Sequence, residues 1–217
     1  MEFFLHQRLR SLSDTPRLDA QVLLAHVLDK PRTWVMANPL TELTNAQQSA
    51  LEAALTRLEG GEPLPYVLGR WEFYGLEFFV TPQVLIPRPE TEHLIERALA
   101  WLRRRSGHCL IADVGCGSGC IAVSLAVNHP DLSIVAIDIS WGALQVARRN
   151  AIQHAAADKI TFIQGDLLSA VAQWGGKPLD LICANLPYVP SAALSRDPTN
   201  CLLYTSDAAD DLLCVDL

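Results

Sequence analysis

The sequence of 217 residues lacks an apolar run of membrane-spanning length, so we expect no transmembrane helix. Its first ten residues carry scattered charges and no continuous apolar stretch, unlike a secretory signal. An excess of basic residues is also missing: the net charge is −7, whereas proteins that bind nucleic-acid phosphates usually present a basic field. We therefore expect a cytoplasmic protein, monomeric, with no membrane and no direct nucleic-acid partner.

Cysteine pairs of the Cys-x-x-Cys type are absent, although the sequence contains six cysteines. They are Cys109, Cys116, Cys120, Cys183, Cys201 and Cys214. Four of them lie in or beside expected core strands and a glycine-rich loop, where cysteine behaves as a small apolar residue. We expect a reducing cytosol and no disulfides. A metal site at Cys116 and Cys120 is the alternative, but no further ligands lie nearby, so we predict no metal.

Residues 1–64 are predicted to form a small helical N-terminal domain. Apolar residues recur at helical spacing after Pro16. Thr44 and Gln47 have the spacing of a capping box at the start of a further helix, which Gly60-Gly61 ends. The domain is interpreted either as a plain helical bundle or as a domain that docks a substrate, and nothing within these residues decides between the two.

Residues 65–89 differ in character, because aromatic side chains gather around Gly75, which predicts a β-hairpin followed by a linker. The segment Pro87-Arg88-Pro89 keeps the linker extended. Pro89 suits the first turn of the next helix, and Glu90 and Glu92 complement the positive end of that helix. The alternative is that this segment is simply the start of a helix.

Residues 90–193 alternate between expected strands and helices, which predicts an α/β domain with a parallel, doubly wound sheet. The expected strands are 110–114, 133–138, 160–164 and 179–184. Ligands of such sheets bind at the carboxyl ends of the strands. We expect the domain to be partial, with about four strands and with strand 179–184 at an exposed edge.

A glycine-rich loop follows the first of these strands. Gly115, Gly117 and Gly119 alternate with the small residues Cys116 and Ser118. Glycine permits the unusual backbone angles of a tight loop and the close approach of a ligand to the main chain. The loop is therefore a candidate ligand-binding segment, and the alternative is an ordinary turn between a strand and a helix.

The spacing of the loop discriminates between cofactors. A dinucleotide fingerprint would require glycine at position 120, where the chain has Cys120. The pattern Gly-x-Gly-x-Gly, preceded by Asp113, resembles the S-adenosylmethionine site of Rossmann-like methyltransferases. Asp138 ends the next strand about twenty residues past the loop, the offset at which such folds place an acid on a ribose. Asp113 and Asp138 are therefore candidate cofactor-binding residues.

A second motif, Asn185-Leu186-Pro187-Tyr188, directly follows the last expected strand. The side-chain carbonyl of Asn185 and the backbone carbonyl of Leu186 can accept the two hydrogens of one planar NH₂ group. Tyr188 supplies a flat face for a planar amide or base. The motif therefore predicts a site that holds an NH₂ group, and the alternative is a polar turn that closes a strand.

The order of these features is similar to that of the HemK/PrmC family, the peptide chain release factor N5-glutamine methyltransferases. The resemblance covers residues 1–193: the helical domain, the hairpin, the segment Leu85 to Glu92, the glycine loop and Asn-Leu-Pro-Tyr. The segment Pro87 to Glu92 is its most family-specific part. Leu186 is a departure, because the usual motif of the family is Asn-Pro-Pro-Tyr.

The resemblance implies a Rossmann-like methyltransferase that methylates the side-chain amide of the glutamine in the Gly-Gly-Gln loop of a release factor. It implies that Gly115–Gly119 hold the methionine part of S-adenosylmethionine and that Asp138 binds the ribose hydroxyls. Asp166 and Leu167 would lie beside the adenine. Asn185 to Tyr188 would hold the glutamine amide, with Asn185 also beside the cofactor. Catalysis would be mainly orientation, with no strong general base.

Two alternatives to this function remain. The first is an adenine-N6 or rRNA methyltransferase, since Asn-Leu-Pro-Tyr also resembles the motif of rRNA adenine dimethyltransferases. The second is a non-catalytic fragment that only binds a partner or the cofactor. The reason for the second is the segment 194–217: its part 201–217 matches nothing in the family pattern and resembles translated adapter sequence. We predict a non-native tail, and the alternative is a divergent one.

Overall fold

A computed structural model of the chain describes residues 2–172, 178–186 and 213–216. The described residues fall into two compact units, one that extends to Leu68 and one that begins at Gly69. We call them the helical unit and the sheet unit.

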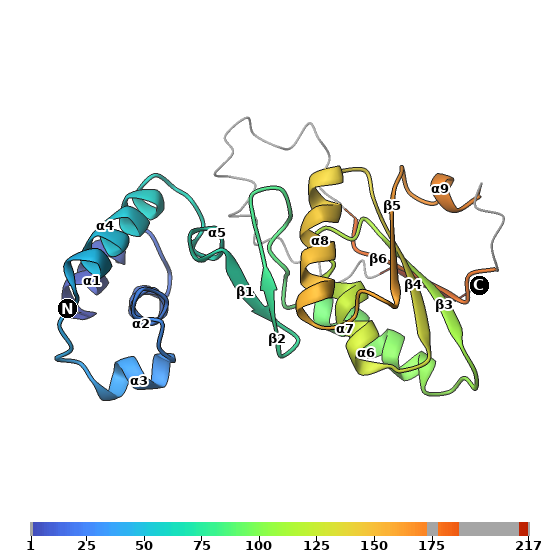
Figure 1. Ribbon diagram of the computed structural model, residues 1–217, viewed down its shortest axis with the longest axis horizontal. Coiled ribbons are helices and arrows are strands. Elements are labelled where there is room, and N and C mark those ends of the chain that lie inside the picture. The colour runs from blue at the N-terminus through green and yellow to red at the C-terminus, as the bar shows by residue number, and fades with distance from the viewer. Residues whose placement is uncertain (1, 173–177, 187–212, 217) are drawn as a thin grey trace. The chain divides into compact units, whose positions relative to one another are not determined.

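The helical unit has five helices in its described part (Figure 1). They are α1 (Glu2–Leu9), α2 (Pro16–Leu28), α3 (Arg32–Ala37), α4 (Asn45–Glu59) and α5 (Leu64–Leu68). Helix α4 begins at Thr44, whose Oγ1 accepts the N–H of Gln47 at 3.3 Å while Gln47 Oε1 accepts the N–H of Thr44 at 3.0 Å. These two bonds satisfy N–H groups that the start of a helix leaves unpaired. The predicted capping box is therefore confirmed.

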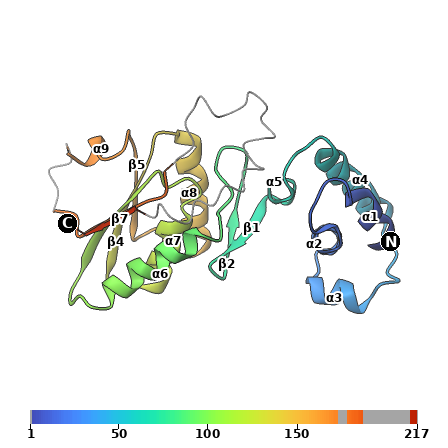
Figure 2. The ribbon, with the colours of Figure 1, turned by 180° about the vertical axis from the view of Figure 1, so that it is seen from behind.

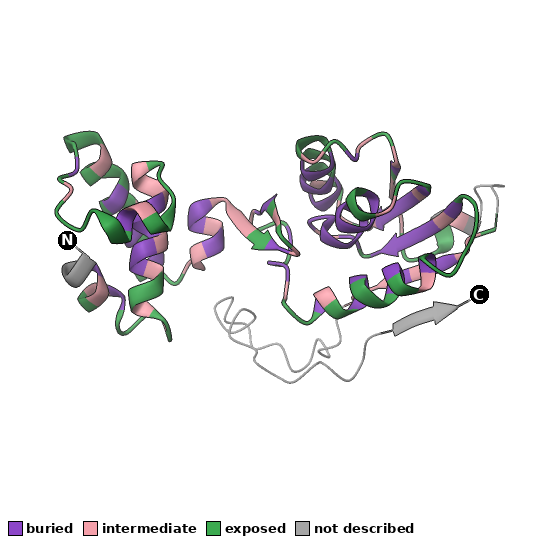
Figure 3. Ribbon diagram, turned by 90° about the horizontal axis from the view of Figure 1, so that it is seen from below, coloured by how far each residue is buried: buried purple, intermediate pink, exposed green. Residues whose placement is uncertain are grey.

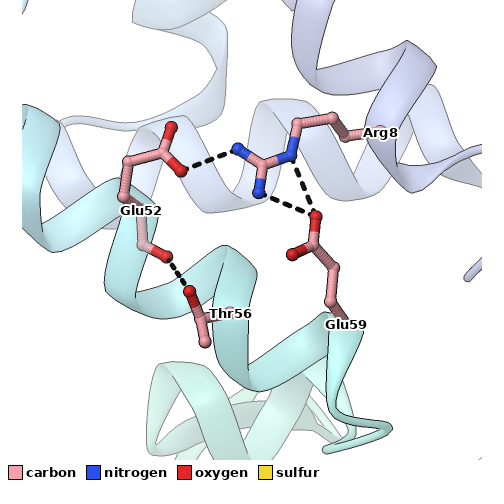
Figure 4. A network of polar contacts seen from close by, with 4 residues as sticks. All are labelled: Arg8, Glu52, Thr56 and Glu59. Atoms are coloured by element: carbon pink, nitrogen blue, oxygen red, sulfur yellow. Dashed lines mark hydrogen bonds and ion pairs between the residues drawn. The ribbon is translucent and has the colours of Figure 1, made fainter.

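Apolar side chains from these helices form one buried core, and polar groups join the helices at the surface. Leu5, Leu23 and Leu55 are fully buried in it. On the outside, Arg8 of α1 donates to Glu52 Oε2 at 2.7 Å and to Glu59 Oε1 at 2.7 and 3.0 Å (Figure 4). These carboxylates raise the pKa of Arg8. Because the pairs are partly exposed, we attribute the packing of α1 on α4 mainly to the core.

Helix α5 corrects the prediction that the hairpin and its linker begin at residue 65. The backbone N–H groups of Tyr66 and Val67 donate to the carbonyl oxygen of Pro63 at 3.0 and 3.1 Å. Val67 and Leu68 are buried in the core of the helical unit. These residues therefore belong to the helical unit and not to the hairpin.

The sheet unit opens with the predicted hairpin, which consists of the antiparallel strands β1 (Arg70–Phe73) and β2 (Leu76–Phe79). Tyr74 and Gly75 form its turn with φ of 52° and 70°. Left-handed angles at both turn residues match the twist of a two-residue hairpin. Phe73 and Phe78 are buried with ring centroids 6.0 Å apart, so one face of the hairpin belongs to the core.

The rest of the sheet unit alternates helices and strands (Figures 1 and 2). Its elements are α6 (Thr91–Leu102), β3 (Cys109–Val114), α7 (Cys120–Asn128), β4 (Leu132–Asp138), α8 (Trp141–Gln153), β5 (Ile160–Gln164), α9 (Ser169–Ala172), β6 (Leu181–Ala184) and β7 (Leu213–Asp216). The strand order is β5-β4-β3-β6-β7, and β3 to β6 are parallel. The prediction of a parallel α/β sheet is confirmed.

The number of strands differs from the prediction. We expected about four strands with strand 179–184 at an exposed edge, but β7 pairs antiparallel with β6 along its full length, from Leu181 opposite Asp216 to Ala184 opposite Leu213. The prediction of an open edge at β6 is therefore wrong. The pairing satisfies backbone groups that an edge strand leaves free. The prediction that segment 194–217 is a non-native tail stays a prediction.

Alternate side chains of the central strands face opposite sides of the sheet, as the period of a strand requires. Ile111 and Ile134 lie in one buried core together with residues of α6, α7 and α8, whereas Ala112 and Val135 lie in a second. Helix α7 is buried from Cys120 to Ala126, and the strands of the sheet are mostly buried (Figure 3). The buried sheet is a rigid base for the loops at its carboxyl end.

Candidate active site

The glycine loop lies at the carboxyl end of β3 and is fastened to the end of β4. The backbone N–H groups of Gly115 and Cys116 donate to the carbonyl oxygen of Ile137 at 2.8 and 2.9 Å. The N–H of Gly119 donates to the carbonyl oxygen of Cys116 at 2.7 Å, which closes the turn into α7. The loop is therefore held at both of its ends.

All three glycines of the loop have left-handed backbone angles, with φ of 71° at Gly115, 53° at Gly117 and 76° at Gly119. A Cβ on Gly119 would lie 2.9 Å from the Cβ of Ala147, so this glycine also permits α7 and α8 to approach each other. A Cβ on Gly117 would meet nothing within 4 Å. The middle of the loop is thus open to a ligand.

Asp138 ends β4, as the sequence pattern predicted, and it also contacts the loop. Its Oδ2 accepts the N–H of Gly117 at 2.9 Å, and its Oδ1 accepts the N–H of Ser140 at 2.9 Å. The Asp138 residue is half-buried. Each carboxylate oxygen can accept more than one hydrogen bond, so these contacts orient the carboxylate and leave acceptor sites for a ligand.

Asp113, the acid before the loop, is fully buried. Its Oδ2 accepts the N–H of Ala122 at 3.0 Å, whereas its Oδ1 has no hydrogen-bond partner among the described residues. Desolvation raises the pKa of this carboxyl group to about 7, and the nearby charge of Asp138 adds to the rise. A buried oxygen without a partner is expensive, and a polar group in the site would satisfy it.

Asn185 follows β6, which lies beside β3 with Ala184 opposite Val114. Its Nδ2 donates to Oγ1 of Thr91 at 2.9 Å, and Thr91 is 3% exposed. One end of the amide is thereby occupied. The side-chain carbonyl of Asn185 is the end that can accept a hydrogen from an NH₂ group.

The next residue brings the two motifs together. A Cβ on Gly115 would lie 2.8 Å from Cδ2 of Leu186, so the glycine loop and the Asn-Leu-Pro-Tyr motif are in contact. Pro187 and Tyr188, the other two predicted members of this motif, lie outside the described residues.

The remaining predicted site residues are Ser118, within the loop, and Asp166 and Leu167, which follow β5. Gly165, which precedes Asp166, donates its N–H to the carbonyl oxygen of Asp138 at 3.1 Å, so the ends of β5 and β4 meet. Asp166 is exposed, and Leu167 is 52% exposed with a φ of 49°. Ser118, within the loop, is 2% exposed.

Cys116, within the loop, is also buried. Burial raises the pKa of the Cys116 thiol, and it raises the pKa of Cys120 to about 12, so both are protonated at neutral pH. Among residues 2–172, 178–186 and 213–216, no group of three or more side chains could hold a metal ion. No helix in the described part of the chain is long and apolar enough to cross a bilayer.

Asn150 is a site residue that sequence reasoning missed. It is fully buried on α8, donates from Nδ2 to the carbonyl oxygen of Ser118 at 2.9 Å and to that of Phe79 at 3.0 Å, and accepts the N–H of Phe79 at 2.7 Å. It therefore fastens the hairpin to the glycine loop. The signal in the sequence is one amide among the small apolar residues of a buried helix face.

Two family models match the chain. The model described as PrmC N-terminal domain matches residues 5–69, and the model described as Methyltransferase small domain matches residues 94–209. The second match covers strands β3 to β6, the glycine loop and Asn185. The sheet unit is therefore a Rossmann-like methyltransferase domain.

Curated relatives show which family of methyltransferases the chain belongs to. A release factor glutamine methyltransferase of Coxiella burnetii is 40% identical over 206 residues, which are 93% of this chain and 73% of the relative. A relative with the same name from Nitratidesulfovibrio vulgaris is 43% identical over 88% of this chain and 65% of its own length. Another from Escherichia coli is 44% identical over 82% of this chain and 62% of its own length. The chain belongs to the release factor glutamine methyltransferase family. It spans about two thirds of the length of these relatives.

Proposed function

We propose that this chain catalyses the S-adenosylmethionine-dependent transfer of a methyl group to the side-chain amide nitrogen of a release factor glutamine. The observation that carries the proposal is the contact between the two motifs: the glycine loop and Asn185 lie side by side at the carboxyl ends of β3 and β6. A cofactor on the loop and an NH₂ group on Asn185 would be neighbours, and proximity in the correct geometry is a large part of catalysis.

The residues around the loop fit the cofactor. S-adenosylmethionine supplies an electrophilic methyl group on a sulfonium. Asp138 offers carboxylate acceptors suited to ribose hydroxyls, and it is already oriented by Gly117 and Ser140. The buried Oδ1 of Asp113 lacks a partner among the described residues, and the space above Gly117 is open. The exposed Leu167 gives the end of β5 an apolar surface on which adenine can pack.

The chain's own contribution to the chemistry is to hold the substrate amide. The side-chain carbonyl of Asn185 and the backbone carbonyl of Leu186 accept the two hydrogens of the glutamine NH₂ group. Two acceptors fix the direction of the nitrogen lone pair and place electron density on it. No general base is needed in this scheme if the proton leaves the nitrogen after transfer.

The substrate is inferred from the relatives, whose names state that they act on the glutamine of a release factor. The helical unit matches the model described as PrmC N-terminal domain, and we infer that it docks that protein. The net charge of −7 disfavours the adenine-N6 or rRNA alternative, in which phosphate contacts need a basic field.

A labelling experiment tests the proposal. The purified protein is incubated with methyl-labelled S-adenosylmethionine and, in separate reactions, with a release factor, with the same factor in which the Gly-Gly-Gln glutamine is replaced by alanine, and with RNA or DNA. We expect label only in the unaltered factor. Label in adenine would assign the protein to the alternative class, and cofactor binding without any transfer would support a fragment that only binds.

A further inference from the structure

The segment Pro-Arg-Pro-Glu-Thr-Glu provides the partner of the Asn185 side chain. Thr91, the first residue of α6, accepts a hydrogen bond from Nδ2 of Asn185 across 94 positions of the sequence at 2.9 Å. Thr91 is 3% exposed, so water does not compete freely for this bond. The contact joins the most family-specific segment of the chain to the motif that holds the substrate amide.

We propose that Thr91 is a positioning residue that holds the Asn185 side-chain amide in place beside the glycine loop. The inference rests on the proposed function, because the position of the amide affects catalysis only if Asn185 binds an NH₂ group. A primary amide has a donor end and an acceptor end of nearly the same shape. With Nδ2 on Thr91, the carbonyl is the end left for the substrate. If the amide turned over, two NH₂ groups would face each other and neither could accept.

The position of Thr91 is itself fixed from both sides. Its backbone N–H donates to the carbonyl oxygen of Arg88 at 3.0 Å, within the segment that the two prolines keep rigid. The neighbouring Glu92 accepts the N–H of Tyr74 at 2.9 Å and so attaches the same turn to the hairpin. Since the hydroxyl lies on the backbone-anchored first turn of a helix, it can hold the Asn185 amide with little freedom.

Two substitutions separate the hydroxyl from the shape of the side chain. Thr91→Val keeps the volume and removes the acceptor, whereas Thr91→Ser keeps the acceptor and removes a methyl group. Thr161→Val, at an exposed position of β5, is the matched control for the effect of Thr→Val itself. Each variant is assayed for kcat and KM with a release factor, for the Kd of S-adenosylmethionine, and for thermal stability.

We expect Thr91→Val to lower kcat/KM for the release factor by about tenfold or more, as the loss of one positioned hydrogen bond would. Thr91→Ser and Thr161→Val should stay within about threefold of the wild type, and the cofactor Kd should change by less than about twofold in all three. A purely structural Thr91 would instead lower the melting temperature and leave the kcat of the folded enzyme unchanged. That result would overturn the proposal.

A second readout does not depend on activity. In ¹⁵N-labelled protein the side-chain NH₂ signal of Asn185, identified by its loss in Asn185→Asp, should shift and exchange faster with solvent in Thr91→Val but not in Thr91→Ser. If the wild type transfers no methyl group to any release factor, the proposed function fails while this signal still decides whether Thr91 holds the amide. An unchanged signal in Thr91→Val refutes the positioning role.

Discussion

Replacement of Asp113 by asparagine should change how the stability of the protein depends on pH. The carboxyl group is fully buried, and its pKa rises from the usual 3.8 to about 7 in the folded protein, mainly through desolvation. Between these two values the folded state binds a proton that the unfolded state has lost. The free energy of unfolding therefore falls as the pH rises from about 4 to about 7, and it levels off above that range.

The size of the effect follows from the shift. At about 1.36 kcal/mol for each pKa unit, the rise to about 7 corresponds to a loss on the order of 4 kcal/mol across the interval. Asparagine has nearly the same shape, can accept the N–H of Ala122 through its own carbonyl, and does not titrate. The Asp113→Asn protein should therefore lack this loss and gain stability relative to the wild type as the pH rises.

The assay is urea denaturation of both proteins at intervals between pH 4.5 and pH 8, without ligand. Other carboxyl groups contribute to both curves, so the difference between them isolates position 113. Asp158→Asn, which removes an exposed carboxylate, is the control and should give a curve parallel to the wild type. Parallel curves for Asp113→Asn as well would show that the buried carboxyl group has an ordinary pKa, and the reasoning from burial would be wrong.

Three further changes test the framework of the site. Gly119 has a φ of 76°, and a Cβ there would lie 2.9 Å from Ala147, whereas Gly75 has a φ of 70° and open space around it. Gly119→Ala should therefore lower the free energy of unfolding by about 2 kcal/mol more than Gly75→Ala does. Equal losses in a denaturation experiment would contradict the close approach of α7 and α8. Asn150→Ala should lower the free energy of unfolding by about 3 kcal/mol, because it leaves buried backbone groups without hydrogen-bond partners. The exposed Gln153→Ala is the control and should lower it by under about 1 kcal/mol. Similar losses in thermal melts would refute the role of Asn150 in fastening the hairpin to the loop. Asp138→Ala should weaken the binding of S-adenosylmethionine by about 1–3 kcal/mol, as measured by calorimetry. An unchanged affinity would show that Asp138 does not bind the cofactor.

The parts of the fold that the sequence predicted are those that depend on local rules. The capping box at Thr44, the hairpin turn at Gly75 and the loop from Gly115 to Gly119 each need particular backbone angles or local hydrogen bonds, which only a few residue types supply. The contact of Asp138 with the loop was also predictable, because the carboxyl ends of adjacent parallel strands meet at one edge of the sheet.

The contacts that the sequence did not predict join residues far apart in the chain. Thr91 and Asn185 are separated by 94 positions, and Asn150 and Phe79 by 71. Neither pair has a spacing rule, since each depends on how a helix packs against the sheet or the hairpin. Strand β7 was missed for a related reason: its pairing with β6 is decided by a free edge elsewhere in the fold and not by its own pattern.

Leu186, which stands where the usual family motif has proline, is expected to matter more for stability than for activity. We expect Leu186→Pro to change kcat/KM of the folded enzyme by no more than about fivefold, because the proposed function uses the backbone carbonyl of this residue and a residue before proline already favours extended angles. The Leu186 side chain, however, packs against the second core of the sheet and over Gly115. Its loss should lower the melting temperature by about 2–4 °C, the equivalent of about 1 kcal/mol of apolar burial. Leu186→Ala serves as the control, since it removes the packing without fixing the backbone. If the proline variant gained a hundredfold in activity, rigidity of this residue and not the position of its carbonyl would limit the reaction.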